Sequence, residues 1–492
     1  MATVSIFKDL PAVAWLGIFG SLWILSLLNR ALNTPLRKVP GPWYAMFTNL
    51  WLKKQILSGR RIHYVHDMHL KYGPVVRISP TEVDVLDQDS FKTIHRIGGG
   101  FVKDPWYSSF RVGQAEDVFS MLDPAEHAQR RKLLAPMFSN SALMKNWYPV
   151  ITEKIDATIS AIKEEAKEQG EVDIFKWWTF MTADVVSHLA FGEPFGMVAE
   201  KKKTYHMQKI EDAGKFGLIC SELPWLRTII NWIPIRSVQE LDADDVVQQL
   251  AETTMKRSRE AGIGSTNLFS RIVAESEKDK KALTDYEVAF EAGGLIVAGS
   301  GTTAVTLTYL VWAVLSHPDI QRRLEDEVGA LEPGFVDSDL EKLPYLSAVV
   351  AETLRLYSAA PGALPRRMLN NTVNLAGYAI PPGATISTQA YSYHRDSSIY
   401  PEPERYEPGR FLDSNGNFQP MRSGAYFPFG AGTRACLGMH LAYIELRHAV
   451  AAFFRECKGA RTAPRTSPDS MEMANFFLVV PKANSCFIQL PN

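Results

Sequence analysis

Cysteine is scarce in this sequence, and the few that occur are not spaced for a disulfide framework or a zinc site. The 492 residues contain four, none in a CxxC pair: Cys220, Cys436, Cys457 and Cys486. Small disulfide-stabilised domains and zinc knuckles need paired, closely spaced cysteines. We therefore expect a reducing compartment, in which a single cysteine is free to act as a metal ligand or a nucleophile.

The sequence also lacks an excess of charge of either sign. Its formal net charge is -1, and the longest run of like charge is Lys201–Lys203. A nucleic-acid-binding protein needs a basic surface, so we expect no nucleic-acid partner. Internal repeats, low-complexity segments and Pro/Ser-rich linkers are absent as well. These absences predict one large domain over residues 39–492, preceded by a separate segment over residues 1–38.

Long uncharged runs are rare, and the first of them predicts a membrane anchor. Leu10–Leu28 holds 19 residues without a charge, about 28 Å as a helix against ~30 Å of hydrocarbon. Arg30, Arg37 and Lys38 follow it, which places the rest of the chain in the cytoplasm. A cleaved signal peptide is disfavoured, since no small-x-small site follows the run. Val39–Pro42 is predicted to be a hinge between anchor and domain.

The remaining pattern predicts a mainly α-helical domain with small β-sheets. Residues between about 86 and 358 are mainly helical in periodicity. Strands are expected in a hairpin and in three later segments: Val75–Ile78, Glu82–Leu86, Val373–Leu375, Thr385–Gln389 and Phe476–Val480.

The longest helix is predicted to begin after Thr284. Thr284-x-x-Glu287 has the form of a capping box, and Pro318 disfavours helix just before it, so the helix should end near Ser316. Gly293–Val305 carries no charge, which predicts burial on all sides. Such a helix spans ~45–50 Å and can form one wall of an interior cavity.

The most informative stretch surrounds one of the four cysteines. In Phe427–Gly438, Gly430 and Gly432 permit a tight turn, and Cys436 lies just before an apolar helical sequence. Helix N-termini stabilise a thiolate, which is the form that binds iron. A dinucleotide loop is disfavoured because Pro428 breaks the strand it needs, and no base is evident for a cysteine nucleophile.

This stretch resembles the haem-binding signature of the cytochrome P450 monooxygenases at every fixed position, Phe429-Gly-x-Gly-x-Arg-x-Cys-x-Gly. The resemblance covers the chain from about residue 39 to its end and implies a haem b cofactor with Cys436 as the axial iron ligand. Through His127 and the segment Pro361–Arg367, the chain also resembles fungal microsomal members of specialised metabolism. The cofactor-binding residues that the resemblance implies in this loop are Phe429, Gly430, Gly432, Arg434, Cys436 and Gly438.

A second motif supports the resemblance. Glu352-x-x-Arg355 could be an ordinary surface ion pair on a helix. It is similar to the family's Glu-x-x-Arg element, with Arg410 as the downstream partner. The resemblance implies a buried network of these three residues that holds the cysteine loop in place.

A third motif lies midway along the long helix, in Ala298–Thr303. A back-bonding threonine could simply bend the helix. The resemblance instead implies that Gly299 opens a groove for oxygen and that Thr302 orients the water that protonates it. Gly301 departs from the family, in which many members carry an acid, so the proton route must run through water, substrate or another group.

Basic residues from two segments are implied to bind the haem propionates. His127 and Arg131 are spaced to share one helix face, where the family commonly has Trp-x-x-x-Arg. Arg366 resembles the family's strand arginine, with Arg367 as an alternative. Two neighbouring cations, Arg130 and Lys132, would then be free to attract an acidic electron donor.

The resemblance implies a single-pass enzyme of the endoplasmic reticulum membrane that inserts one oxygen atom from O2 into an apolar small molecule. Electrons would come from NADPH through a separate flavoprotein reductase, or in part from a b-type cytochrome. Leu223–Ile235, with Trp225 and Trp232, is predicted to dip into the bilayer, with an ordinary buried lid as the alternative. By family position, the residues that line the substrate pocket would be Val297, Ala298, Ala359–Leu364 and Phe476–Phe477.

Other classes of function remain open on the same sequence. A haem-thiolate isomerase or dehydratase would need no external electrons; Gly301 permits this and Thr302 speaks against it. A desaturase or coupling enzyme would keep the same fold. A haem sensor or carrier would bind ligands without turnover, and a nicotinamide-dependent dehydrogenase fits the sequence least well.

Overall fold

The computed structural model describes residues 12–110, 116–223, 225–226, 267, 272, 283–421 and 424–491, and these are mainly helical, as predicted. The helices before residue 223 are α1 (Ala12–Asn33), α2 (Leu50–Leu57), α3 (Arg61–Tyr72), α4 (Gln88–His95), α5 (Pro124–Leu134), α6 (Asn140–Asn146), α7 (Tyr148–Gln169), α8 (Ile174–Phe191), α9 (Met197–Glu200) and α10 (Tyr205–Glu222). The later helices are α15 (Asp285–Leu315), α16 (Pro318–Gly329), α17 (Asp337–Leu340), α18 (Pro344–Tyr357), α19 (Ala390–Tyr393) and α20 (Met439–Glu456).

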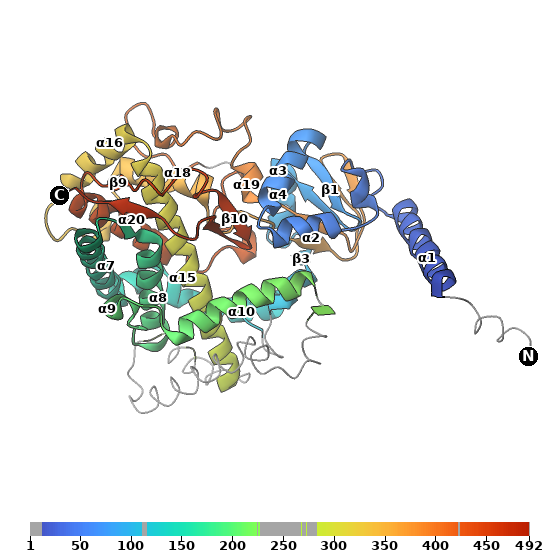
Figure 1. Ribbon diagram of the computed structural model, residues 1–492, viewed down its shortest axis with the longest axis horizontal. Helices are drawn as coiled ribbons and strands as arrows, with labels where there is room; N and C mark the ends of the chain where they lie inside the picture. The colour runs from blue at the N-terminus through green and yellow to red at the C-terminus, as the bar shows by residue number, and fades with distance from the viewer. Residues whose placement is uncertain are drawn as a thin grey trace, which may run out of the picture.

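The strands form small separate sheets. The largest has the order β1-β2-β8-β5-β3 and lies with α2, α3 and α4 between α1 and the helical remainder (Figure 1). Its strands are β1 (Val75–Ser79), β2 (Glu82–Val85), β3 (Phe101–Lys103), β5 (Arg366–Met368) and β8 (Thr385–Ser387). The others are β4 (Val172–Asp173), β6 (Val373–Leu375), β7 (Tyr378–Ile380), β9 (Arg461–Thr462), β10 (Met473–Phe476), β11 (Leu478–Pro481) and β12 (Phe487–Gln489). The predicted β1–β2 hairpin is confirmed as an antiparallel pair.

The sequence prediction at Phe476–Val480 is wrong in one respect. A single strand was expected, whereas the segment is the turn and second arm of a hairpin in which β10 pairs antiparallel with β11. Phe477 occupies the turn between them, with φ of +75°. Residues 476–480 are an unbroken apolar run that continues through the turn, so the sequence pattern alone does not reveal the reversal.

Helix α15 crosses the helical part of the molecule, with α8 and α20 near it (Figure 1). Its start is confirmed, because Thr284 and Glu287 form the capping box in both directions. Glycine at position 299 permits the close approach of α8: a Cβ there would stand 2.8 Å from Cγ2 of Val186. The Thr182 hydroxyl donates to the Ser300 carbonyl at 2.8 Å and ties the two helices together.

The prediction that the middle of α15 is buried on all sides is wrong. Val297 is 44% exposed, and Ala298 next to it is exposed as well. The opposite side of the helix carries buried residues such as Ala292 and Ile296. One face of the uncharged segment is therefore accessible, and the absence of charge reflects apolar surroundings rather than complete burial.

The segment after α1, which includes the predicted hinge at Val39–Pro42, is hydrogen-bonded to the sheet. The Arg77 guanidinium donates to the carbonyls of Leu36, Val39 and Pro42, at 3.3, 2.9 and 3.4 Å. The Thr34 hydroxyl donates to the Pro80 carbonyl at 2.8 Å, and Leu36 is fully buried. Packing against the domain thus already includes Ala31, near the end of α1, which is 3% exposed.

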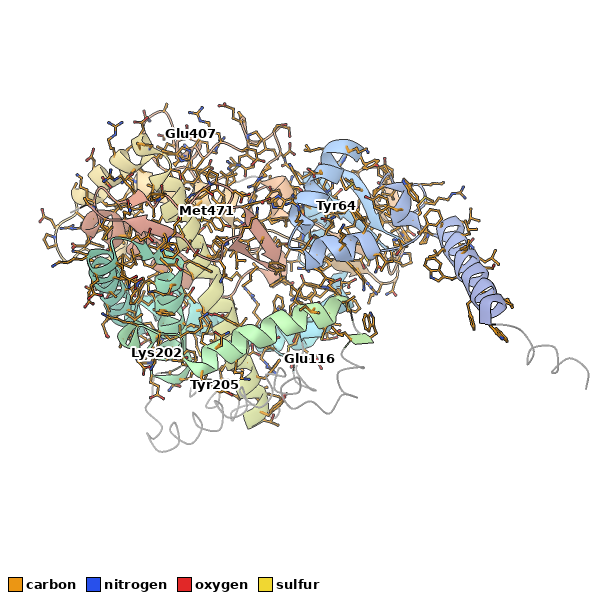
Figure 2. All side chains as sticks on the ribbon, in the orientation of Figure 1. Tyr64, Glu116, Lys202, Tyr205, Glu407 and Met471 are labelled. Carbon is orange, nitrogen blue, oxygen red and sulfur yellow. The ribbon has the colours of Figure 1, made fainter. Side chains whose placement is uncertain are left out.

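Helix α1 stands apart from the domain, and its side chains project with no other ribbon around them (Figure 2). Large apolar residues on it are exposed, including Phe19 and Trp23 at 62% each. Within the described residues, a helix long and apolar enough to span a membrane occurs at Tyr286–Leu315, which is the interior helix α15. The N-terminal span therefore stays a prediction, and most of Leu223–Ile235 lies outside the described residues.

Candidate functional site

The cysteine loop is a tight turn that leads directly into α20. The Cys436 amide donates to the Phe429 carbonyl at 2.8 Å, and the helix begins three residues later at Met439. Gly430 and Gly432 have φ of +70° and +66°, the left-handed conformation that favours glycine. A Cβ on Gly432 would also overlap the backbone carbonyl of His95. Both predicted loop glycines are therefore required by the backbone.

The side chain of Cys436 is accessible to solvent, yet protein atoms surround its sulfur closely enough to desolvate it. Its side chain is exposed, whereas Cys220, Cys457 and Cys486 are buried. Desolvation nevertheless raises the pKa of the Cys436 thiol, opposed by a hydrogen bond from the Gly438 amide and by the charge of Arg131. The predicted stabilisation by the helix start is present but smaller than the effect of burial. A lasting thiolate therefore needs a positively charged ligand such as a metal ion, which deprotonates a coordinating thiol.

The Glu352–Arg355–Arg410 network implied by the resemblance is present. Arg355 Nε and Nη2 donate to Oε2 and Oε1 of Glu352 at 2.7 and 2.8 Å, and Arg410 Nε donates to Oε1 at 3.0 Å. The side chains of Glu352 and Arg355 are 0% exposed. A charged group this deep is stable only when paired and hydrogen-bonded on every side.

His394 connects this network to the cysteine loop. Arg355 Nη1 donates to the His394 carbonyl at 2.6 Å, and the His394 Nδ1 meets the Arg355 carbonyl at 2.8 Å. The Phe427 amide donates to His394 Nε2 at 3.1 Å, so that ring nitrogen is an acceptor. Burial lowers the pKa of His394 to about 3 and keeps the ring neutral. Phe427 is two residues before Phe429, so the network positions the start of the loop.

Beside the cysteine loop lies a group of cations that includes Arg131, Arg366 and Arg434. Among the described residues, no carboxylate lies within 4 Å of these three arginines, whereas Arg130 and Arg367 each pair with one. Arg131 donates to the Ala435 carbonyl at 2.7 Å, and Arg434 donates to the Met121 carbonyl at 2.8 Å. Arg366 donates to the Tyr107 hydroxyl at 3.2 Å. The structure thus brings together the arginines expected to bind propionates, from α5, β5 and the cysteine loop.

These cations are close enough to disturb one another. Burial and then the charge of Arg366 lower the pKa of Arg434 to about 10. Burial and then the charges of Arg434, Lys103, Arg131 and Arg366 lower the pKa of His127 to about 3. Repelling cations in a desolvated position indicate that an anionic ligand belongs there. The two carboxylates of a haem suit this donor set, so the residues present fit that cofactor.

Lys103 belongs to the same cluster and was missed by the sequence reasoning. It ends β3, is only 6% exposed, and its Nζ lies 3.9 Å from the centre of the Tyr107 ring. Burial and the charges of Arg366 and Arg434 hold its pKa well below the ordinary value. No motif surrounds Lys103; only the pairing of β3 with β5, which places it opposite Arg366, reveals its role.

Arg130 and Arg367 form ion pairs with carboxylates outside this group of cations, and the pair of Arg130 corrects the prediction that it is free. Arg130 was predicted to be free for an electron donor, but it is buried and pairs with Glu291 at 2.7 Å. Arg367, the alternative to Arg366, pairs with Asp104 at 2.5 Å. Lys132 remains exposed. The pairing of Arg367 favours Arg366 as the propionate ligand.

Thr302 lies next to the accessible face of α15. Its hydroxyl donates to the Ala298 carbonyl at 2.6 Å, so the helix satisfies it in this state. A Cβ at Gly301 would stand 3.5 Å from Cδ1 of Leu478 on β11. An apolar side chain therefore covers the position where many family members have an acid. The proposed catalytic roles of Gly299, Gly301 and Thr302 remain predictions, although Gly299 also serves the packing of α8.

An accessible cysteine in a glycine turn before a helix, a buried Glu-Arg-Arg network behind it, and cations without counter-charges beside it define the class of haem-thiolate proteins. The sequence comparisons agree. The profile of the family Cytochrome P450 matches residues 38–487. The chain belongs to the cytochrome P450 family of monooxygenases.

The three curated relatives that follow are similar to this chain over nearly its whole length. Cytochrome P450 monooxygenase cypX of Dothistroma septosporum is 36% identical over 95% of this chain and 93% of the relative. Cytochrome P450 monooxygenase aflV of Aspergillus parasiticus is 36% identical over 98% of this chain and 97% of its own length. Cytochrome P450 monooxygenase stcB of Emericella nidulans is 38% identical over 94% of this chain and 90% of the relative.

Proposed function

We propose that this chain is a membrane-anchored haem b monooxygenase that inserts one oxygen atom from O2 into an apolar small molecule of secondary metabolism. Its electrons come from NADPH through a separate flavoprotein reductase. The observation that carries the proposal is Cys436, the accessible cysteine of the four, at the end of a loop fixed by the Glu352 network. A thiolate-ligated haem supplies the oxygen-activating chemistry when bound.

Separate groups of residues bind the iron and the carboxylates of that cofactor. Cys436 provides the sulfur ligand, and the Gly438 amide donates to that sulfur. Arg131, Arg366 and Arg434 hold the carboxylates, with Lys103 adding a fourth cation. Lys103 and Arg366 are buried and Arg131 and Arg434 are half-buried before the ligand binds, so the ligand gains charge-assisted hydrogen bonds without competing ion pairs.

The Oγ1 atom of Thr302 holds in place the water that delivers a proton. The Thr302 hydroxyl donates to Ala298, which leaves the oxygen lone pairs as acceptors toward a water on the accessible face. Leu478 excludes water from the side of Gly301. The proton therefore arrives along the other side of Thr302, through water or a polar group of the substrate.

The membrane anchor and the redox partner are part of the proposal. Exposed apolar side chains on α1, such as Leu22, Trp23 and Leu25, suit lipid contact. The basic residues after it favour a single-pass protein of the endoplasmic reticulum with its domain in the cytoplasm. With Arg130 buried, exposed Lys132 is the remaining cation of that predicted docking site for the reductase.

The carbon monoxide difference spectrum of the reduced protein tests the proposal. Thiolate ligation gives a far red-shifted Soret band, and Cys436→Ala should abolish it. Cys457→Ala is the matched control, because Cys457 is buried away from the loop and its loss should leave the band in place. A wild-type spectrum without the shift would contradict the proposal. Turnover without reductase and O2 would favour a haem-thiolate isomerase or dehydratase, the class that Gly301 permits.

A further inference from the structure

Four partly exposed aromatic side chains from three segments meet in one group, beside the buried ring of Tyr107. The centroids of Phe110 and Phe119 lie 5.6 Å apart, and each lies 5.5 Å from the centroid of Phe477. Trp106 lies 4.9 Å from Phe110 and 5.9 Å from Phe477. We call Trp106, Phe110, Phe119 and Phe477 the aromatic cluster. Such spacings are typical of edge-to-face and tilted ring pairs.

The aromatic cluster is separate from the hydrophobic core. Within the described part of the chain, none of its four side chains joins a buried core group, and all four keep part of their surface exposed. Large aromatic rings are normally used to fill a core. A concentration of partly exposed rings instead indicates a surface for an apolar ligand.

The cluster lies between the accessible face of α15 and the group of cations that includes Lys103. Phe477 is followed by Leu478, whose Cδ1 lies 3.5 Å from the Cβ position of Gly301, next to Thr302. At the other end, the Nζ of Lys103 lies 4.4 Å from the centre of the Phe119 ring. A molecule on the exposed ring surface would therefore reach the accessible face of α15.

The backbone at Phe477 adds an independent observation. Its φ of +75° is a left-handed conformation, which is strained for a residue with a bulky side chain. The buried Asn475 holds the turn by donating from Nδ2 to the Phe477 carbonyl at 3.0 Å. Glycine would adopt this turn without strain, so the phenyl ring itself is the reason for phenylalanine here.

Phe476, also expected to line the substrate, points elsewhere. Its ring lies against Gly59 between α2 and α3, with Cζ 2.9 Å from the position of a Cβ on that glycine. It has no ring contact with the aromatic cluster among the described residues. The turn at Phe477 thus sends two adjacent phenylalanines to opposite sides of the hairpin.

We propose that the aromatic cluster binds a planar, fused aromatic ring system in the substrate, with Phe477 as the specificity-determining residue. This inference rests on the proposed function, because it names the substrate class of the same site. Flat rings gain ring-on-ring contact with Phe110, Phe119 and Phe477, while a puckered saturated ring of equal carbon number keeps only the apolar contact.

The test compares phenanthrene with its saturated counterpart, perhydrophenanthrene, by titrating the haem-loaded full chain and following the Soret shift. Wild type should bind phenanthrene more tightly. Phe477→Leu keeps apolar bulk but removes the ring, so phenanthrene affinity should fall about 3- to 10-fold. Affinity for perhydrophenanthrene should change less than about 2-fold, the change expected of apolar contact alone. Phe476→Leu, on the same hairpin, should change neither affinity.

Three outcomes would overturn the inference: equal weakening of both compounds by Phe477→Leu, no weakening of either, or no binding of phenanthrene to wild type. The red-shifted carbon monoxide band, recorded for every variant, separates this failure from failure of the proposed function. If that band is absent, haem-free protein still tests the cluster. Phenanthrene should then quench tryptophan fluorescence, and Trp106→Phe should remove most of the quenching.

Discussion

Arg355 and Glu352 meet in a two-pronged ion pair, at 2.7 and 2.8 Å, with both side chains 0% exposed. The pair lies on α18, and through His394 it supports the loop that carries Cys436. A buried pair of this kind adds little net stability compared with apolar packing. Its value is geometric, because Arg355 also donates to the carbonyls of His394, Pro403 and Arg405, and Glu352 accepts a hydrogen bond from the Glu407 amide.

Removing one charge from this pair should therefore be severe. Glu352→Gln leaves the buried Arg355 and the half-buried Arg410 without a counter-charge, and we expect a loss of about 3–5 kcal/mol in unfolding free energy. Chemical denaturation and haem occupancy measure it. Glu404→Gln is the control, because Glu404 pairs with Arg395 at 3.1 Å but is 67% exposed. Its effect should stay below about 1 kcal/mol.

Lys103 should affect the haem-free and haem-loaded proteins in opposite directions. Without the cofactor, its charge is buried beside Arg366 and Arg434. Lys103→Met keeps the packing against Tyr107 and Phe119 and removes the repulsion. We expect the haem-free protein to gain about 1–3 kcal/mol and the haem-loaded protein to release haem faster.

Thermal unfolding of the haem-free form and haem transfer to an acceptor globin measure these two effects. Lys92→Met provides the comparison, because Lys92 is exposed on α4 and should alter neither quantity. A loss of stability in both forms would mean that Lys103 has only a packing role.

Much of this site follows from the sequence because its motifs are local. The loop glycines, Cys436 and the Glu352 network can be recognised in short segments whose backbone needs fix the residue types. Sequence spacing does not reveal Lys103, because the pairing of β3 with β5 is long-range. It also misjudged Arg130, since adjacent residues on α5 face different directions and only packing decides which one meets Glu291.

The pH dependence of the haem-free protein should report His127. Its pKa is lowered from 6.5 to about 3 by burial and nearby cations, so the folded state binds fewer protons than the unfolded state between those values. Stability is therefore full above pH 6.5 and falls as the pH drops toward 3. The loss is at most about 1.4 kcal/mol per pH unit.

His127→Gln keeps an N–H donor and removes this titration. Its unfolding free energy should decrease less steeply between pH 6.5 and 4 than that of wild type. His394 has a similarly lowered pKa and is unchanged in the variant, so part of the slope should remain. Equal slopes in urea denaturation at several pH values would show that His127 does not titrate on unfolding.

Thr302 and Thr308 make the same bond in different surroundings, which allows a matched test of the proton route. Thr302 donates to Ala298 at 2.6 Å beside the accessible face, and Thr308 donates to Ala304 at 2.8 Å in full burial. Thr302→Val removes the hydroxyl that we expect to orient the protonating water. Product formed per NADPH consumed should then fall several-fold, with peroxide making up the difference, while Thr308→Val should keep the wild-type ratio.

Because Leu478 covers Gly301 with apolar surface, no neighbouring acid should rescue Thr302→Val. An unchanged ratio in that variant would place the proton route through the substrate instead.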